Sequence, residues 1–142
     1  MDSMKILVVD DEDHILHMIK KRLESNGFTV FTAKKGHDGI EIARENKPDL
    51  ILLDVMLPDL NGRVVCRVLK EDPATAKIPV IFLTAKDTME EKMAEYEVGG
   101  ECHIAKPFNG QELVEKIKRT LQDISTFEKR RRNDDASKNL DS

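Results

Sequence analysis

The chain has 142 residues and a formal net charge of -4, with 39% apolar and only 4% aromatic residues. A chain of this length folds as one domain around its own apolar core. The acidic balance argues against general binding to nucleic acids or anionic membranes, and no apolar run reaches membrane-spanning length. No secretory signal is visible and the two cysteines lack CxxC spacing, so we expect a cytoplasmic protein with reduced thiols.

Short apolar runs alternate with amphipathic segments along the first part of the chain. Residues 5–9 are apolar and β-branched, which indicates a strand, and the acidic run 10–13 follows directly. A helix is expected next, with apolar residues at helical spacing up to a stop at Asn26-Gly27. Residues 29–33 then predict a second strand, and a weaker helix follows it over residues 36–46.

The stretch 49–58 is the most informative one in the chain. Four large apolar residues run directly into Asp54, which is the pattern of a strand buried on both faces at the centre of a parallel sheet. In open α/β sheets the carboxyl ends of the strands are where ligands and chemistry collect. Residues 58–62 supply turn and helix-start signals just beyond. An aspartate in this position is also common as a turn residue or helix cap, so the stretch alone leaves both interpretations open.

The same alternation continues to the end of the chain. Further elements are expected as a helix from Gly62 to before Asp72-Pro73, a buried strand over 78–84 ending in Thr84, a helix from Asp87 with a capping box at Glu90, a short strand over 102–105 and a last helix from about Gln111. Strands that alternate with helices imply an α/β, doubly wound parallel sheet, because each parallel crossover needs a helix. Neither of the usual Gly-rich phosphate loops occurs, so we expect no nucleotide binding by those routes.

Polar side chains follow four of the predicted strands and would meet at one edge of the sheet. They are Asp10, Asp11, Asp54, Thr84 and Lys106. Carboxylates about 4 Å apart repel by roughly 4 kcal/mol at an effective dielectric of 20, so three of them need a cation to stay ionised together. An oxygen-rich site with open positions suits Mg²⁺. The residue types predict a carboxylate nucleophile, a metal that offsets phosphoryl charge, and a hydroxyl and an ammonium that hold phosphoryl oxygens.

Taken together, these segments resemble the receiver domain of bacterial two-component response regulators, over residues 4–125. The matching segments are ILVVDD at 6–11, PDLILLDVMLP at 48–58, DPAT at 72–75, IPVIFLTA at 78–85 and KPF at 106–108. The resemblance implies a flavodoxin-like, five-stranded sheet with strand order 2-1-3-4-5 and five helices. It also implies that Asp54 accepts a phosphoryl group from a phosphohistidine.

The resemblance implies a role for each of the other polar residues as well. Asp11, Asp54 and the backbone carbonyl of Met56 would hold Mg²⁺, and Asp10 would support the metal through water. Thr84 and Lys106 would contact the phosphoryl oxygens.

One position departs from the family pattern. The family usually places Tyr or Phe three residues before the site lysine, where the ring moves inward on activation as the hydroxyl at the Thr84 position shifts; here the residue is His103. A tolerated replacement without a new role is the simpler interpretation. The alternative hypothesis is a switch that depends on pH near about 6 to 7, where histidine titrates.

Residues 126–142 lie beyond the predicted domain. We expect a helix extension and a charged, disordered tail, in which the basic run 129–132 is a solvated helix end. The chain is therefore expected to be a stand-alone receiver or a fragment of a longer regulator.

The predicted function is a phosphorylation switch, not an enzyme, although self-catalysed phosphoryl uptake and hydrolysis are expected. A sensor histidine kinase or histidine phosphotransfer protein would supply the phosphoryl group. Phosphorylation would change binding to an unknown downstream protein, or drive formation of a homodimer, through the face made by the fourth helix, fifth strand and fifth helix. No direct nucleic-acid binding and no membrane insertion are expected.

Two alternatives come from other functional classes. An aspartate-nucleophile phosphohydrolase typically carries a second aspartate two positions after the nucleophile, where this chain has Met56. A receiver-like docking module that never takes phosphate is disfavoured by the presence of all five site residues.

Overall fold

The computed structural model describes residues 3–85, 94, 98–100 and 102–124. The elements in chain order are β1 (Lys5–Val9), α1 (Asp13–Ser25), β2 (Thr29–Ala33), α2 (Gly36–Asn46), β3 (Leu50–Asp54), α3 (Gly62–Glu71), β4 (Val80–Thr84) and β5 (Cys102–Ala105). Residues 110–124 form a further helix. The helix predicted from Asp87 and the tail predicted over 126–142 lie outside the described residues.

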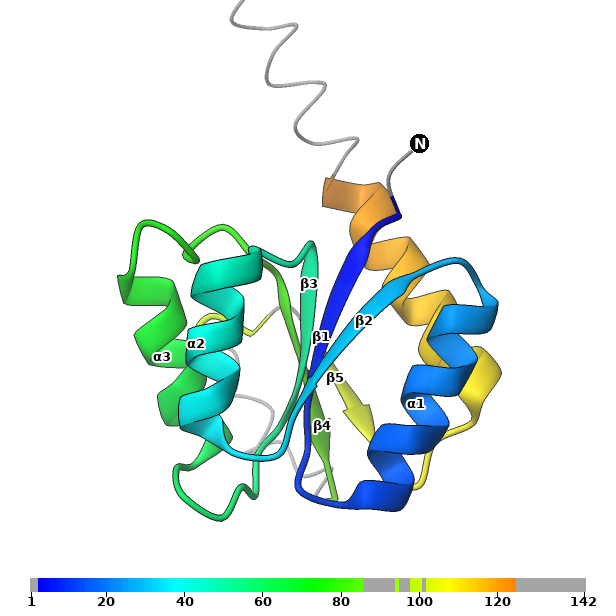
Figure 1. The fold of residues 1–142 in the computed structure, drawn as a ribbon, viewed down its shortest axis with the longest axis horizontal. Helices are drawn as coiled ribbons and strands as arrows, with labels where there is room; N and C mark the ends of the chain where they lie inside the picture. The colour runs from blue at the N-terminus through cyan, green and yellow to red at the C-terminus, as the bar shows by residue number, and fades with distance from the viewer. Residues whose placement is uncertain (1–2, 86–93, 95–97, 101, 125–142) are drawn as a thin grey trace, which may run out of the picture.

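The five strands form one parallel sheet in the order β2-β1-β3-β4-β5, which confirms the predicted flavodoxin-like arrangement. In Figure 1, α2 and α3 lie on one side of the sheet, and α1 and helix 110–124 lie on the other. Because all strands run the same way, the carboxyl ends of β1, β3, β4 and β5 share one edge of the sheet. Among the described residues, no helix has both the length and the apolar character needed to cross a membrane.

Strand β4 begins two residues later than the sequence predicted, at Val80 instead of Ile78. Ile78 N donates to Thr75 O at 3.1 Å, so Ile78 still belongs to the preceding turn. Pro79 has no N–H to offer a ladder, although its carbonyl accepts from Ile51 N at 3.0 Å. The apolar run therefore marks buried residues, whereas the strand itself begins at Val80, just after the proline.

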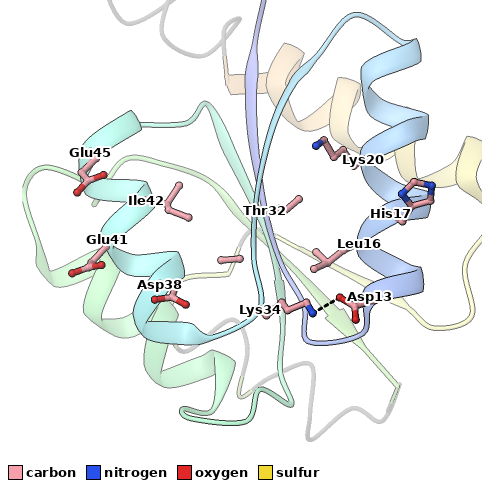
Figure 2. A pocket seen from close by; sticks show the side chains of 11 residues that line it. Asp13, Leu16, His17, Lys20, Thr32, Lys34, Asp38, Glu41, Ile42 and Glu45 are labelled. Atoms are coloured by element: carbon pink, nitrogen blue, oxygen red, sulfur yellow. Dashed lines mark ion pairs between the residues drawn. The ribbon is translucent and has the colours of Figure 1, made fainter.

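The edge of the sheet at β2 is open between two helices. Within the part of the chain that the structure describes, β2 pairs with β1 on one side only, and most of its side chains are exposed or half-buried. Figure 2 shows this edge between α1 and α2. Lys34, just after the strand, forms an ion pair with Asp13 at the start of α1.

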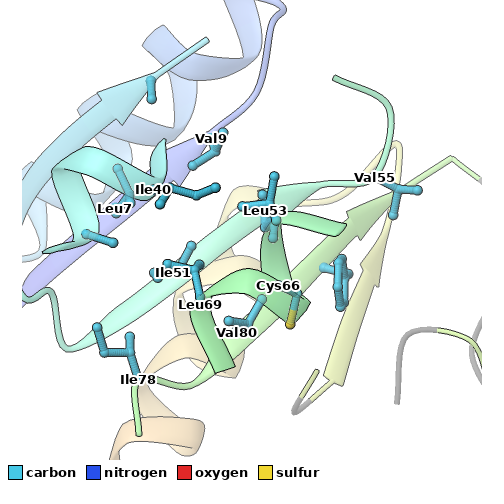
Figure 3. Packing of buried hydrophobic residues seen from close by; sticks show 14 residues of the cluster. Leu7, Val9, Ile40, Ile51, Leu53, Val55, Cys66, Leu69, Ile78 and Val80 are labelled. Atoms are coloured by element: carbon cyan, nitrogen blue, oxygen red, sulfur yellow. The ribbon is translucent and has the colours of Figure 1, made fainter. Parts of the chain in front are cut away.

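The centre of the sheet is buried on both faces. Every residue of β3 and β4 is buried, which explains why their sequences are continuous apolar runs. Side chains alternate along a strand, so Ile51 and Leu53 pack with residues of α2 and α3, as Figure 3 shows. Leu50 and Leu52 pack instead with α1 and helix 110–124. Two apolar layers thus hold β3 in place, and with it the position of Asp54.

Helix α2 receives its cap from another part of the chain. Its N-cap residue, Lys35, makes no side-chain cap hydrogen bond. The carboxylate of Asp59 fills this role, because Oδ1 accepts from Gly36 N at 2.7 Å and Oδ2 from His37 N at 3.0 Å. A Cβ at Gly36 would lie 2.7 Å from a methyl group of Val65, so only glycine lets the loop pack this closely.

Replacing Asp59 with alanine is expected to lower the melting temperature at pH 7. The hydrogen bond from His37 N, followed by the other backbone donors, holds the pKa of Asp59 below its usual 3.8. A lowered pKa gives stability that is present above pH 3.8 and is lost as pH falls through the folded pKa. Thermal unfolding of native protein and Asp59→Ala at pH 7 and at low pH measures this. The two melting temperatures should converge in acid; a difference that persists unchanged there would contradict the capping role.

Candidate functional site

The carboxyl edge of the sheet contains the predicted polar cluster. Asp10, Asp11 and Glu12 follow β1, Asp54 ends β3, Thr84 ends β4 and Lys106 follows β5. They surround a pocket of about 610 Å³, which is lined by Asp11, Glu12, Asp54, Val55, Met56, Asn61, Arg63, Thr84, Ala85 and Lys106. The structure therefore gathers all five predicted residues, with Asp10 fully buried behind the pocket wall.

Lys106 links the carboxylates of two strands. Its Nζ donates to Asp10 Oδ2 at 2.8 Å and to Asp54 Oδ2 at 3.3 Å, and it lies 3.8 Å from Glu12 Oε1. Asp10 is 0% exposed and Asp54 is 5% exposed, so these charges interact with little solvent screening. The backbone N–H of Lys106 donates to Thr84 O at 2.7 Å, which fixes the residue beside the end of β4.

Asp54 has the properties of a reactive carboxyl group. Burial, reinforced by the nearby charge of Asp10, raises its pKa from 3.8 to about 6. The charge of Lys106 and a hydrogen bond from Met56 N to Oδ1, at 3.1 Å, act in the opposite direction. Asp54 is thus ionised at pH 7, yet it is less stabilised as an anion than an exposed aspartate.

The same surroundings also shift the pKa of Lys106, and here the neighbouring charges outweigh burial. Burial alone lowers the pKa of Lys106, but the hydrogen bond to Asp10 and the charges of Asp54 and Asp10 outweigh it and raise the pKa above 10.5. Lys106 therefore remains a cation at any physiological pH and supplies a fixed positive charge beside Asp54.

A second group of oxygens lies next to this pair. Carboxylate oxygens of Asp10, Asp11 and Glu12 lie within 4.8 Å of one another. Asp10 Oδ1 also accepts from the backbone N–H of Glu12 at 3.0 Å, which holds the turn after β1. Asp54 contributes no oxygen to this compact trio, but it lines the same pocket as Asp11 and Glu12.

The loop after β3 presses directly against the strand end that carries Asp54. Gly62 N donates to Val55 O at 2.8 Å, and a Cβ at Gly62 would lie 2.1 Å from the backbone oxygen of Asp54. Asn61 caps α3 by accepting from Arg63 N at 2.8 Å. The start of α3 therefore sets the backbone position of Asp54 from behind.

Gly62→Ala is expected to lower the free energy of unfolding by about 2 to 4 kcal/mol, because backbone must move to admit the methyl group. Gly110→Ala is the matched control. There the nearest atom to a new Cβ is the guanidinium of Arg22, at 2.8 Å, which can swing away. Urea unfolding of both variants measures the difference, and equal losses would show that the contact at Gly62 is not the limiting one.

Five residues that line the pocket were not predicted as site residues, namely Val55 and Ala85 and the polar Glu12, Asn61 and Arg63. Glu12 belongs to the acidic run after β1, so its position was a visible signal that was interpreted only as a helix start. Asn61 and Arg63 reach the pocket through the turn into α3, and nothing in their sequence pattern indicated it. His103, the predicted switch residue, lies on β5 opposite Phe82 and does not line the pocket.

Comparison with known proteins assigns the chain to a family. A family model described as the response regulator receiver domain matches residues 6–118. The chain is a response regulator receiver domain. The alkaline phosphatase synthesis transcriptional regulatory protein PhoP of Bacillus subtilis is 40% identical over 120 residues, covering 84% of this chain and 49% of PhoP. The receiver domain described here thus spans about half the length of that relative.

Solved structures share the receiver fold. A response regulator from Chloroflexus aurantiacus superposes with a TM-score of 0.81 at 33% identity, covering 85% of this chain and 99% of that one. A CheY-like receiver domain protein from Methanospirillum hungatei gives 0.83 at 28% identity, covering 88% and 98%. Membership of this family places the chain in two-component signalling.

Proposed function

We propose that this receiver domain accepts a phosphoryl group on Asp54 from a phosphohistidine of a sensor kinase or phosphotransfer protein. One observation carries the proposal: Asp54 is a nearly buried carboxylate that lines an open pocket, with the ammonium of Lys106 3.3 Å away. A carboxylate with a fixed cation beside it is suited to attack an electrophile that brings negative charge with it.

The chain's own residues account for the transfer. With a pKa of about 6, Asp54 is mainly ionised at pH 7 and needs no base to become a nucleophile. One of its oxygens attacks phosphorus, the phosphorus–nitrogen bond of phosphohistidine breaks, and the bonding electrons return to the imidazole, which takes up a proton. Lys106 and the hydroxyl of Thr84 contact the phosphoryl oxygens and offset the added charge.

The donor set fits a magnesium ion. The trio of Asp10, Asp11 and Glu12 is acidic and close enough to share a cation, and Mg²⁺ prefers such oxygen ligands with several positions left for water. Asp11, Asp54 and the Met56 carbonyl would hold the ion, with Asp10 in support. When bound, Mg²⁺ offsets the repulsion between the carboxylates and an incoming phosphoryl group.

Residues 4–125 are proposed as the complete switch, with residues 126–142 as an extension outside it. Phosphorylation shifts a two-state equilibrium in which Thr84 and His103 change position. The partner surface is the face that includes β5 and helix 110–124, and it binds a downstream protein or a second copy.

Intact mass after incubation with acetyl phosphate, with and without Mg²⁺, tests the proposed transfer. We expect one added phosphoryl group, and only when the metal is present. A protein that binds Mg²⁺ but gains no phosphoryl group from acetyl phosphate or from a histidine kinase would instead be a constitutive docking module.

His103→Phe tests whether the histidine adds pH dependence to the switch. The hypothesis expects phosphorylation-dependent change in native protein to weaken or strengthen by at least about twofold between pH 6 and 7.5, and the phenylalanine variant to lose that dependence. Amide chemical shifts of β4 and β5, recorded with beryllofluoride in place of phosphate, provide the readout. Identical pH profiles for the two proteins would leave His103 as a simple replacement.

A further inference from the structure

Among the described residues, no strand pairs with the outer backbone edge of β2. Two hydrogen bonds show which peptide groups point toward that edge. Thr29 N donates to Met4 O at 2.9 Å, and Ala33 O accepts from Asp10 N at 3.0 Å, so both residues turn their peptide groups toward β1. Peptide groups alternate in direction along a strand. Val30 and Thr32 therefore point their N–H and C=O groups away from the sheet, where another strand could pair with them.

A groove of about 720 Å³ lies between α1 and α2 at the C-terminal end of this edge (Figure 2). Its floor includes Thr32 and Ala33 of β2. Leu16 on α1 and Ile42 on α2 add an apolar contact on either side. The groove is separate from the pocket at Asp54, because the two share no lining residue.

The two walls of the groove differ in charge. The α2 wall presents the carboxylates of Asp38, Glu41 and Glu45, which lie on one face of the helix. The α1 wall presents the imidazole of His17 and the ammonium of Lys20, which also forms an exposed ion pair with Glu24 at 3.9 Å. The remaining charges, Lys34 and Asp13, form an ion pair with each other.

These features together specify the chemistry of an occupant. A strand added to β2 would direct alternate side chains toward the α1 layer and the α2 layer. Side chains facing α2 meet carboxylates, so basic residues fit there. Side chains facing α1 meet the ammonium of Lys20, so acidic residues fit there. We propose that the outer edge of β2 is a docking site for an extended segment of a partner protein in which basic and acidic residues alternate.

The spacing of the charges agrees with a short segment. Asp38 and Glu45 are seven residues apart, which is about 10.5 Å along a helix axis. Side chains on one face of a strand repeat every 6.4 to 6.8 Å, approximately. Two or three alternate basic residues therefore span the acidic wall, and a segment of about six residues fills the groove.

A second copy of this chain fits the edge less well. Two-fold symmetric pairing of β2 with itself would be antiparallel and would place α2 of one copy beside α2 of the other. The carboxylates of Glu41 and Glu45 would then face the same carboxylates, which costs energy. The charge pattern thus favours a different protein as partner. This proposal does not depend on phosphorylation of Asp54.

A labelled hexapeptide of alternating lysine and glutamate is the probe, titrated into full-length protein up to millimolar concentration. Its controls have the same composition, either with lysines and glutamates in two blocks or with alternate backbone amides N-methylated. We expect the alternating peptide to bind at least about fivefold more tightly than either control. Amide shift changes should concentrate at Val30 and Thr32 and in the facing sides of α1 and α2.

Charge reversal tests the proposed orientation. Glu41→Lys should weaken binding by about threefold to tenfold, and an alternating peptide with one lysine changed to glutamate should recover part of the loss. Glu71→Lys, an exposed site at the end of α3, carries the same change in net charge and should leave binding unaltered.

Equal binding of the alternating and block peptides, no binding of any of them, or shift changes away from β2 would each overturn the proposal. Self-association of the chain that the alternating peptide displaces would assign the edge to a second copy instead, and would also overturn it.

Discussion

Asp54→Asn is expected to abolish phosphoryl uptake from acetyl phosphate, as measured by intact mass in the presence of Mg²⁺. The amide has the shape of the carboxylate but lacks its nucleophilic charge, so no acyl phosphate can form. We expect no other carboxylate to take over the reaction, because Asp10 is 0% exposed and bound to Lys106, and Glu12 Oε1 lies farther from Lys106 Nζ, at 3.8 Å, than Asp54 Oδ2 does at 3.3 Å.

The loss of labelling in Asp54→Asn must not result from unfolding. The raised pKa of Asp54 predicts that the variant stays folded, and a measurement of its stability serves as the control. A carboxyl group whose pKa is raised in the folded state favours folding below pH 3.8 and loses that contribution as pH rises through about 6. Ionised Asp54 therefore costs stability at pH 7. Asp54→Asn should be as stable as native protein there or more stable, by roughly 1 to 3 kcal/mol in chelator.

Asp49→Asn is the matched variant for the labelling experiment. Asp49 precedes the same strand at its other end, where its Oδ2 accepts from Lys5 N at 2.7 Å, and an asparagine oxygen can still accept there. We expect this variant to take up one phosphoryl group as native protein does. Continued labelling of Asp54→Asn, or loss of labelling in Asp49→Asn, would contradict the assignment of Asp54.

Lys106→Met is expected to lower the stability of the protein substantially. The methionine keeps most of the side-chain volume but leaves Asp10 and Asp54 buried together without their cation. Removing one partner from a buried charge network typically costs about 3 to 5 kcal/mol. Because this site opens into a pocket, we expect a decrease of about 2 to 4 kcal/mol in the free energy of unfolding at pH 7.5 without divalent cations.

The pH dependence of that loss has a definite sign. Lys106 lowers the pKa of Asp54, so its removal moves that pKa further upward from about 6. Protonation of the carboxyl groups relieves their repulsion, and the deficit should shrink steadily from pH 7.5 toward pH 4. Urea unfolding at several pH values measures this, with the exposed Lys77→Met as control. A deficit independent of pH would indicate lost packing and not lost charge.

Added Mg²⁺ should restore part of the stability of Lys106→Met, because a bound divalent cation would replace the missing positive charge. The same variant would still lack the ammonium that we propose contacts the phosphoryl oxygens. In Lys106→Met, added Mg²⁺ is therefore expected to raise the free energy of unfolding without restoring phosphorylation to the native level.

The sheet was predictable from sequence because its strands are buried in a simple pattern. Residues 50–53 are apolar without interruption, which is typical of a strand covered on both faces, and β3 lies at the centre of the sheet. The boundaries of β1, β2 and β5 also agree with prediction. The start of β4 was misplaced because apolar residues 78 and 79 are buried by the turn that precedes the ladder.

The site was predictable where polar residues end strands, and less so where loops supply them. Asp54, Thr84 and Lys106 follow from the strand ends alone. Arg63 lines the pocket only because the turn at Asn61 and Gly62 folds back onto β3, and the capping of α2 by Asp59 joins residues 23 apart in the chain. Such contacts depend on how two loops meet, and a pattern within one segment does not encode that.

The contact between Asp59 and the start of α2 has a consequence for the exchange of segments between receivers. Met56 and Asn61, at the two ends of the loop 56–61, line the pocket at Asp54, so this loop is an obvious choice for transplantation when the properties of the pocket are to be altered. Asp59 in this loop also supplies the cap of α2, and the close fit at Gly36 depends on its position. The loop and the first turn of α2 are thus a single transferable module. A chimera that moves one without the other would lose the hydrogen bonds from Gly36 N and His37 N to Asp59.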